Sequence, residues 1–187
     1  MLALPDYDAR ARALGRHRAV AFHVRSGTMP AAALLALAAS LDPAERCVIL
    51  NDRLDLVPAA GAAGVHLPAR GLPVPVARRL LGPSALVGRS VHGPEEARAA
   101  YEAGADYVFL GPIWETSSHP GTPGLGLAAI GDAHPARVIA IGGVTPTRAA
   151  ACRDAGAVGV AAITALWLAD DPAAAAEAFL LSLEAAQ

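Results

Sequence analysis

Short apolar segments recur along the chain and alternate with longer, alanine-rich segments of mixed polarity. Most of them are nearly continuous in apolar residues instead of alternating apolar with polar ones, which is typical of strands buried on both faces. They cover residues 2–4, 19–24, 47–50, 64–67, 85–90, 107–111, 138–143 and 158–164. The pattern therefore predicts eight short, buried strands.

Helix signals fill several of the intervals between these strands. Residues 94–104 begin with proline and two glutamates and end at glycine, the order expected at the start and stop of a helix. Residues 145–156 and 170–186 follow the same order, with threonine or aspartate as the capping residue and proline in the first turn. Strands that alternate with helices indicate parallel strands joined by right-handed crossovers.

Two architectures fit such an alternation: an open, doubly wound α/β sheet and a closed eight-stranded (β/α)8 TIM barrel. The eight strands, and the polar or glycine-rich residues after several of them, favour the barrel. At 187 residues it is small, since about 250 is typical. We therefore expect some helices to be short or missing, above all after the first and third strands. No linker rich in glycine, serine or proline divides the chain, so residues 1–187 are predicted to form a single TIM-barrel domain.

Composition and charge narrow the class of partner. The chain is 54% hydrophobic and 17% charged, enough for a large core. A net charge of −2 gives no electrostatic reason to expect nucleic acid as a partner. Apolar runs end well before the roughly 18 residues of a membrane helix, and no signal-peptide pattern opens the chain. Cys47 and Cys152 are far apart and fit buried thiols. We expect a cytoplasmic protein that acts on a small molecule.

Polar residues follow most of the apolar segments, where each predicted strand ends. In a TIM barrel the C-terminal strand ends carry the chemistry, so these side chains are expected to meet at one rim. Each one alone has a plainer explanation as a turn, a cap or a core residue, and their convergence is what favours a site. A spacing of two also places Ser90 with His92, and His23 with Arg25, on the same side of a strand.

The glycine pair Gly142–Gly143 ends the seventh predicted strand directly before a helix. A tight turn would explain it, and so would a ligand that approaches the backbone closely. In TIM barrels a frequent phosphate site uses the loops after strands seven and eight, through backbone N–H groups. Ile163 and Thr164 end the eighth predicted strand. We therefore hypothesise that a phosphate binds at the C-terminal ends of these two strands.

Five segments resemble the family of thiamine phosphate synthase and its TenI-type thiazole tautomerase relatives. They are ILNDRLDL, AAGVHLP, VGRSVHGPEEARAAYEAGADYVFLGPIWET, VIAIGGVTP and AGAVGVAAITAL, in the family's order between residues 20 and 172. The resemblance implies the barrel and a bound thiazole phosphate. The residues it implies for that phosphate are Gly142, Gly143, Ile163 and Thr164, with Thr116 and Ser118 from the loop after the sixth strand.

The resemblance also implies further roles near the reacting centre. Ser90 would lie beside the reacting atoms. In a synthase, Asn51 would contact a pyrimidine pyrophosphate, Arg25 is the one cation kept from the family's pattern after the second strand, and Asp52 would help to hold Mg²⁺.

The chain departs from the synthase pattern at charged positions. The departures are His23 and Gly27 in place of glutamine and lysine, Arg70–Gly71 in place of a second metal carboxylate, and His119 in place of a lysine. Fewer cations and carboxylates would neutralise a pyrophosphate leaving group less well. Tautomerisation of a thiazole carboxylate phosphate needs no metal, only a phosphate site and a general acid/base such as histidine.

We therefore predict a TenI-like thiazole tautomerase, with His119 or His92 as the acid/base and Ser90 at the reacting centre. A tautomerase pattern carries its histidine where this chain has Pro112, so another histidine would have to act. Two alternatives stay open: a synthase that uses Mg²⁺ at Asp52, and a non-catalytic regulatory paralogue. Otherwise no cofactor is expected, and the partners are a phosphorylated thiazole and further copies of the chain. Residues 111–126 have the length and composition of a mobile loop.

Overall fold

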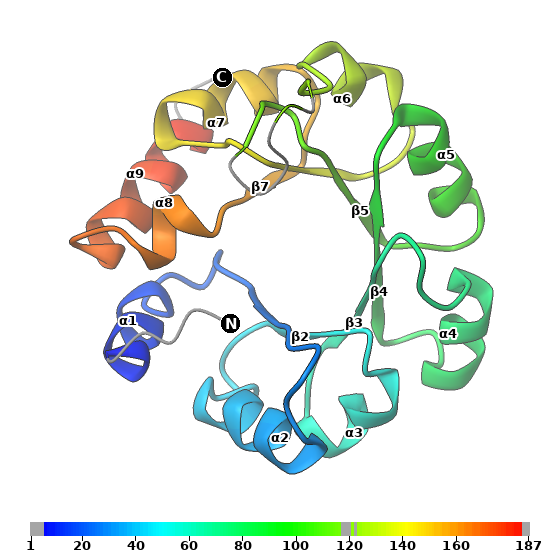
Figure 1. Cartoon of the computed structure of the whole chain (residues 1–187), viewed down its shortest axis with the longest axis vertical. Helices are drawn as coiled ribbons and strands as arrows, with labels where there is room; N and C mark the ends of the chain where they lie inside the picture. Colours follow the sequence, from blue (N-terminus) through cyan, green and yellow to red (C-terminus); the bar gives the residue numbers. More distant parts are fainter. Residues whose placement is uncertain (1–5, 117–120, 122, 185–187) are drawn as a thin grey trace.

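The computed structural model describes residues 6–116, 121 and 123–184. Within them, seven parallel strands form one curved sheet whose order follows the chain (Figure 1). The strands are β1 (Phe22–Val24), β2 (Val48–Asn51), β3 (Gly64–Leu67), β4 (Leu86–Val91), β5 (Tyr107–Leu110), β6 (Val138–Ile141) and β7 (Gly159–Ala161).

Helices surround the outer face of the sheet (Figure 1). They are α1 (Tyr7–Leu14), α2 (Ala31–Ser40), the 3₁₀ turn η1 (Leu54–Leu56), α3 (Val57–Ala60), α4 (Val74–Leu81), α5 (Pro94–Glu102), α6 (Ala128–Asp132), α7 (Pro146–Asp154), α8 (Thr164–Trp167) and α9 (Pro172–Glu184). None of the described helices is both long enough and apolar enough to cross a membrane.

Local signals in the sequence place these elements well. Every described strand falls within, or one residue beyond, an apolar segment predicted as a strand. At the start of α9, Asp171 Oδ1 accepts hydrogen bonds from the amides of Ala173 and Ala174, as expected of a capping aspartate. The helix after the third predicted strand, α3, has only four residues, as the short chain required. After the first predicted strand, residues 2–4, the helix is not missing: α1 follows and has eight residues.

The closed eight-stranded barrel is wrong for the described part of the chain. The α/β class and a curved, TIM-like parallel sheet are confirmed, and each strand pairs with the next from β1 to β7. Among the described residues, however, β1 and β7 do not pair with each other, and the first predicted strand, residues 2–4, lies outside them. The sheet is therefore a curved, incomplete cylinder, open between its two three-residue edge strands.

Side chains from the helices bridge the opening between β1 and β7. Trp167 of α8 stacks on Tyr7 of α1, with ring centroids 5.1 Å apart, and meets the ring of Phe22 of β1 edge-on at 6.2 Å. Arg10 of α1 donates hydrogen bonds to the carbonyl oxygens of Trp167 (3.1 Å) and Ala169 (2.6 Å). We call Tyr7, Arg10, Phe22 and Trp167 the seam cluster. It joins the two ends of the sheet where strand hydrogen bonds do not.

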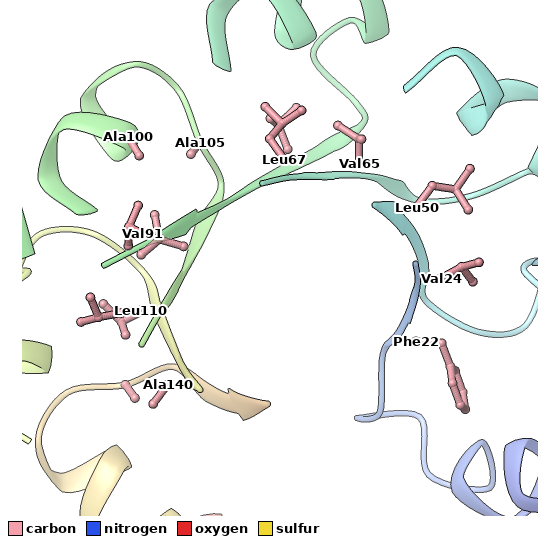
Figure 2. Packing of buried hydrophobic residues seen from close by; sticks show 14 of the residues in the cluster. Phe22, Val24, Leu50, Val65, Leu67, Val91, Ala100, Ala105, Leu110 and Ala140 are labelled. Atoms are coloured by element: carbon pink, nitrogen blue, oxygen red, sulfur yellow. The ribbon is translucent and has the colours of Figure 1, made fainter. Parts of the chain in front are cut away.

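The main core lies between the sheet and the helices, because alternate residues of each strand point outward. Figure 2 shows Val24, Leu50, Val65, Leu67 and Leu110 on this outer side, all of them buried. Burial of such side chains contributes about 1.5–3 kcal/mol each, which makes this layer the main source of stability. The residues between them point inward and are free to serve the site.

We expect Trp167→Ala to lower the free energy of unfolding by about 2–3 kcal/mol, because it removes both aromatic contacts of the seam cluster. Urea denaturation followed by circular dichroism measures the change. Leu181→Ala on α9 is the control, since Leu181 is 58% exposed and its truncation should cost under about 0.5 kcal/mol. Equal midpoints for the two variants would contradict a bridging role for Trp167.

Candidate functional site

A cavity of about 920 Å³ opens at the C-terminal ends of the strands. It brings together every predicted site residue that the structure describes, while Ser118 and His119 lie outside the described residues. Those in the lining are Arg25, Asn51, Asp52, Ser90, His92, Thr116, Gly142, Gly143, Ile163 and Thr164. These residues thus lie together at one rim, and their roles in binding or catalysis stay predictions. Its volume is in the usual range for small-molecule sites.

A buried histidine inside the curved sheet, His66, positions the Ser90 side chain at the floor of the cavity. His66 of β3 is 1% exposed, and its Nε2 lies 2.8 Å from Ser90 Oγ. On the other side of the ring, His66 Nδ1 lies 3.4 Å from the hydroxyl oxygen of Tyr107. If Nε2 accepts the Ser90 hydroxyl hydrogen, Nδ1 carries the ring proton and points to Tyr107. This chain of contacts fixes the rotamer of Ser90 at the cavity floor.

Two histidines share this interior and both stay neutral. The rings of His23 and His66 are 5.3 Å apart and each packs on Phe109. Burial lowers the pKa of His23 to about 4, against a smaller opposing effect of Asn51. Burial, followed by the neighbouring charges of His23, Arg25 and other groups, lowers the pKa of His66 to about 3. At neutral pH the floor of the cavity therefore carries no positive charge from these rings.

Of the four buried side-chain polar atoms without a hydrogen-bond partner among the described residues, all but Arg153 Nη2 lie at or beneath the cavity. Among the described residues, His23 Nδ1, Asn51 Oδ1 and Thr116 Oγ1 are buried and make no hydrogen bond. Asn51 and Thr116 line the cavity itself, and His23 lies just beneath it next to Asn51. Orphaned buried polar groups cost about 1–3 kcal/mol each, so their clustering indicates a polar ligand that satisfies them.

The glycine pair forms a tight turn, and another group also approaches its backbone closely. That group is a segment of the same chain. Gly142 and Gly143 have φ angles of 93° and 69°, which favour glycine strongly. A Cβ at Gly142 would lie 2.6 Å from the Cα of Pro112, and one at Gly143 would lie 2.8 Å from the Cβ of Trp114. The segment after β5 therefore crosses directly over the pair.

The backbone amides at the ends of β6 and β7 remain available to a ligand despite this crossing. Among the described residues, the N–H groups of Gly142, Gly143, Ile163 and Thr164 donate to no protein acceptor. All four residues line the cavity, and Thr164 adds a hydroxyl group. Convergent backbone N–H groups are the donors with which proteins commonly bind phosphate oxygens.

His92 has a structural role that the sequence did not reveal. Its Nδ1 lies 3.0 Å from the carbonyl oxygen of Gly111 and donates to it, which ties the end of β4 to the end of β5. Its amide donates to Glu96 Oε2, at the start of α5. Of the two ring nitrogens, Nε2 is the one left for a ligand.

The residues at the β3–α4 turn contribute structure rather than charge. Arg89 donates to the carbonyl oxygens of Leu72 and Ala69, both at 2.7 Å, and so shapes the turn. Arg70 is exposed and is not in the described lining of the cavity. Gly71 lies where a Cβ would be 2.7 Å from a ring carbon of Pro68. The position where the family pattern has a second carboxylate is therefore a compact turn.

The curved parallel sheet and a cavity at its C-terminal strand ends define a TIM-barrel-like protein that binds a small molecule. A family model described as thiamine monophosphate synthase matches residues 7–166. The chain therefore belongs to this family.

Proteins similar to this chain are named thiamine-phosphate synthase. One, from Anaeromyxobacter dehalogenans, is 46% identical over 187 residues, covering 96% of this chain and 84% of the relative. Another, from Mycobacterium tuberculosis, is 46% identical over 144 residues, covering 73% of this chain but only 64% of the relative. The match thus spans less than two thirds of that relative's length.

Solved structures agree on the fold. The thiamine phosphate pyrophosphorylase from Pyrococcus furiosus superposes with a TM-score of 0.84 at 27% identity, covering 99% of this chain and 92% of that chain. A 3-hexulose-6-phosphate synthase, with a TM-score of 0.72 at 21% identity, shows the fold alone. The names of the relatives support an enzyme of thiamine biosynthesis and favour the synthase alternative over the tautomerase that we predicted.

We expect the free energy of unfolding to fall as the pH drops from about 6.5 towards 4. In this window the unfolded chain protonates His23 and His66, while the folded interior keeps both rings neutral, so acid favours the unfolded state. The loss at pH 5 relative to pH 7 is on the order of 1–2 kcal/mol for each ring. Urea denaturation at several pH values measures it.

The controls for this pH dependence are two single substitutions. His23→Gln removes one of the buried rings and should reduce the change between pH 7 and pH 5 by about half. His134→Gln removes an exposed ring and should leave the change as it is. A slope that His23→Gln does not alter would show that His23 is not buried as described.

Proposed function

We propose that this protein is a thiamine-phosphate synthase, which joins a pyrimidine pyrophosphate to a thiazole phosphate. The observation that carries the proposal is a single cavity with two separate polar ends. One end holds Asn51 and Asp52 at the end of β2, and the other holds Gly143 and Thr164 after β6 and β7. Three strands separate β2 from β6 in the sheet. Two phosphorylated substrates fit this arrangement better than one.

The reaction exchanges one bond for another. The thiazole ring nitrogen forms a bond to the methylene carbon of the pyrimidine, and the bond from this carbon to the pyrophosphate oxygen breaks. Its electron pair leaves on the pyrophosphate. In this proposal Arg25 and Asn51 bind the leaving group, and the Gly143 and Thr164 amides bind the thiazole phosphate; all four residues line the cavity. The main catalytic contribution is then to hold the two reactants in contact.

Ser90 and the neutral interior rings would form the floor between the two substrates. Because His66 fixes the Ser90 hydroxyl at 2.8 Å, the group is oriented before a ligand arrives. Phe109 of β5 is also in the lining and offers an apolar surface beside it. A floor of fixed dipoles and aromatic surface excludes water from the reacting carbon without adding a charge.

The residues at the pyrophosphate end fit Mg²⁺ if the substrate supplies most of the ligands. The described residues include no cluster of three or more histidine, cysteine, aspartate or glutamate side chains that could hold a metal ion. They do offer the Asp52 carboxylate and the orphaned Asn51 Oδ1 in one lining. Mg²⁺ commonly binds one or two carboxylates plus substrate phosphates. When bound, it would neutralise charge on the leaving pyrophosphate.

The names of the relatives are the main reason to favour the synthase over the tautomerase. Tautomerisation needs a histidine whose ring nitrogens can exchange a proton with the substrate. His92 Nδ1 is committed to the Gly111 carbonyl oxygen, and burial lowers the pKa of His23 to about 4. His23 is therefore poorly suited to proton transfer near neutral pH, whereas Nε2 of His92 is left for a ligand.

The assay for this function mixes the purified protein with the pyrimidine pyrophosphate, the thiazole phosphate and Mg²⁺. We expect thiamine phosphate and inorganic pyrophosphate to form in equal amounts, and only when all three are present. Mass spectrometry detects the first product and a coupled phosphate assay the second. Loss of a thiazole carboxylate tautomer without Mg²⁺, and no coupling, would contradict the proposal.

We expect Asp52→Asn to lower kcat/KM by at least about tenfold and to raise the Mg²⁺ concentration needed for half-maximal rate, because the carboxylate is lost. Asp52 has a φ of 64°, which asparagine tolerates well, so the turn should be kept. Asp55→Asn is the matched control, since Asp55 lies three residues on, paired with Arg53. Equal rates for the two variants would rule out Asp52 as a metal ligand.

A further inference from the structure

Arg148 is a cation of the cavity lining to which neither the strand-end pattern nor the family segments assign a role. It lies in the first turn of α7, and its Nη1 donates a 2.7 Å hydrogen bond to the carbonyl oxygen of Gly143. Its guanidinium carbon lies 4.8 Å from the centroid of the Trp114 ring. Two contacts thus hold an exposed arginine at the edge of the cavity.

The position of Arg148 is unfavourable for a purely structural cation. A positive charge in the first turn of a helix opposes the helix dipole, and the first turn of α7 has no acidic residue to offset it. Among the described residues, no carboxylate forms an ion pair with Arg148. Arg148 is thus an oriented positive charge without a carboxylate partner, beside the four backbone amides that donate to no described acceptor. An anionic ligand would bind to both.

We propose that Arg148 binds the phosphate monoester of the thiazole substrate at the Gly143 end of the cavity. This deepens the proposed function and rests on it. Arginine has five N–H donors, and the hydrogen bond to Gly143 uses one, so the others are available for phosphate oxygens. Its Nη1 lies 3.5 Å from where a Gly143 Cβ would be, whereas Asn51 and Asp52 lie at the end of β2, across the sheet. The monoester is therefore its partner, and not the pyrophosphate.

Trp114 makes Arg148 effective although the side chain is exposed. Stacking on an indole ring restricts the guanidinium to one plane, so less side-chain entropy is lost when a phosphate binds. The same segment after β5 also carries Thr116, whose orphaned Oγ1 lies in the lining. The phosphate corner is thus built from three parts: the amides after β6 and β7, the Thr116 hydroxyl, and Arg148 on its tryptophan support.

The test compares two ligands that differ only in the phosphate. Isothermal titration calorimetry measures binding of the thiazole phosphate and of the corresponding thiazole alcohol to the full chain and to Arg148→Gln and Arg148→Met. We expect tenfold or greater weakening for the phosphate in both variants, and no change for the alcohol. Arg148→Met keeps an apolar stem on Trp114 and so separates charge from packing. Arg148→Lys should recover part of the loss.

Arg137→Gln is the matched control. Arg137 is an exposed arginine directly before β6, at the opposite end of the strand from the cavity, and its removal should leave both affinities unchanged. Unchanged phosphate binding in Arg148→Gln and Arg148→Met would overturn the inference. Equal weakening of phosphate and alcohol would overturn it too, because it would mean that Arg148 only supports the loop. So would wild-type protein that binds the phosphate no more tightly than the alcohol.

Turnover is measured separately, so that the two proposals can fail independently. In the coupling assay, Arg148→Gln should raise KM for the thiazole phosphate about tenfold and leave KM for the pyrimidine pyrophosphate unchanged. A rise in the second KM alone would place Arg148 at the other substrate and overturn the inference. If the wild-type protein forms no thiamine phosphate but Arg148 variants still lose phosphate binding selectively, the inference stands and the synthase proposal fails.

Discussion

The site depends on one backbone crossing, in which the segment after β5 lies across the end of β6. The amide of Ile113 donates to the carbonyl oxygen of Ile141 at 2.9 Å, and that of Trp114 to the carbonyl oxygen of Gly142 at 3.1 Å. These two bonds extend the pairing of β5 with β6 beyond the strands. They require glycine at 142 and 143, and they place Thr116 in the cavity lining and the Trp114 ring against Arg148. A change that lifts this segment would therefore disturb several binding groups together.

The interior beneath the cavity is polar, in contrast to the apolar layer outside the sheet. His23, His66 and Tyr107 pack against one another and against Phe109, and Ser90 is the point where this layer reaches the cavity. Burial of these groups costs free energy at acid pH, and the outer layer of aliphatic side chains has to offset it. The apolar side chains that stabilise the fold and the polar side chains beneath the cavity thus lie on opposite faces of the same strands.

The seven described strands and the helices α5, α7 and α9 could be predicted from the sequence, because they follow from local apolar patterns and helix start and stop signals. The topology of parallel sheets then placed the polar strand ends at one rim. The closure of the sheet could not, since no local pattern shows whether edge strands such as Phe22–Val24 find a partner. Arg148 was missed because an arginine in a helical segment resembles any solvated surface charge. The double contact of Trp114 with Gly143 and Arg148 joins residues about 30 positions apart, which periodicity does not reveal. Ser118 and His119 remain predictions.

The opening between β1 and β7 has a mechanical consequence for the cavity. Arg25 extends from the β1 edge, and Thr164 follows the β7 edge, so the two halves of the cavity meet on either side of a join made by the seam cluster. Side-chain contacts yield more easily than a ladder of strand hydrogen bonds. The most compliant direction of the cylinder is then the one that changes the distance between Arg25 and Thr164 across the cavity. The contacts of Trp167 and Arg10 in the seam cluster control how far this distance can change.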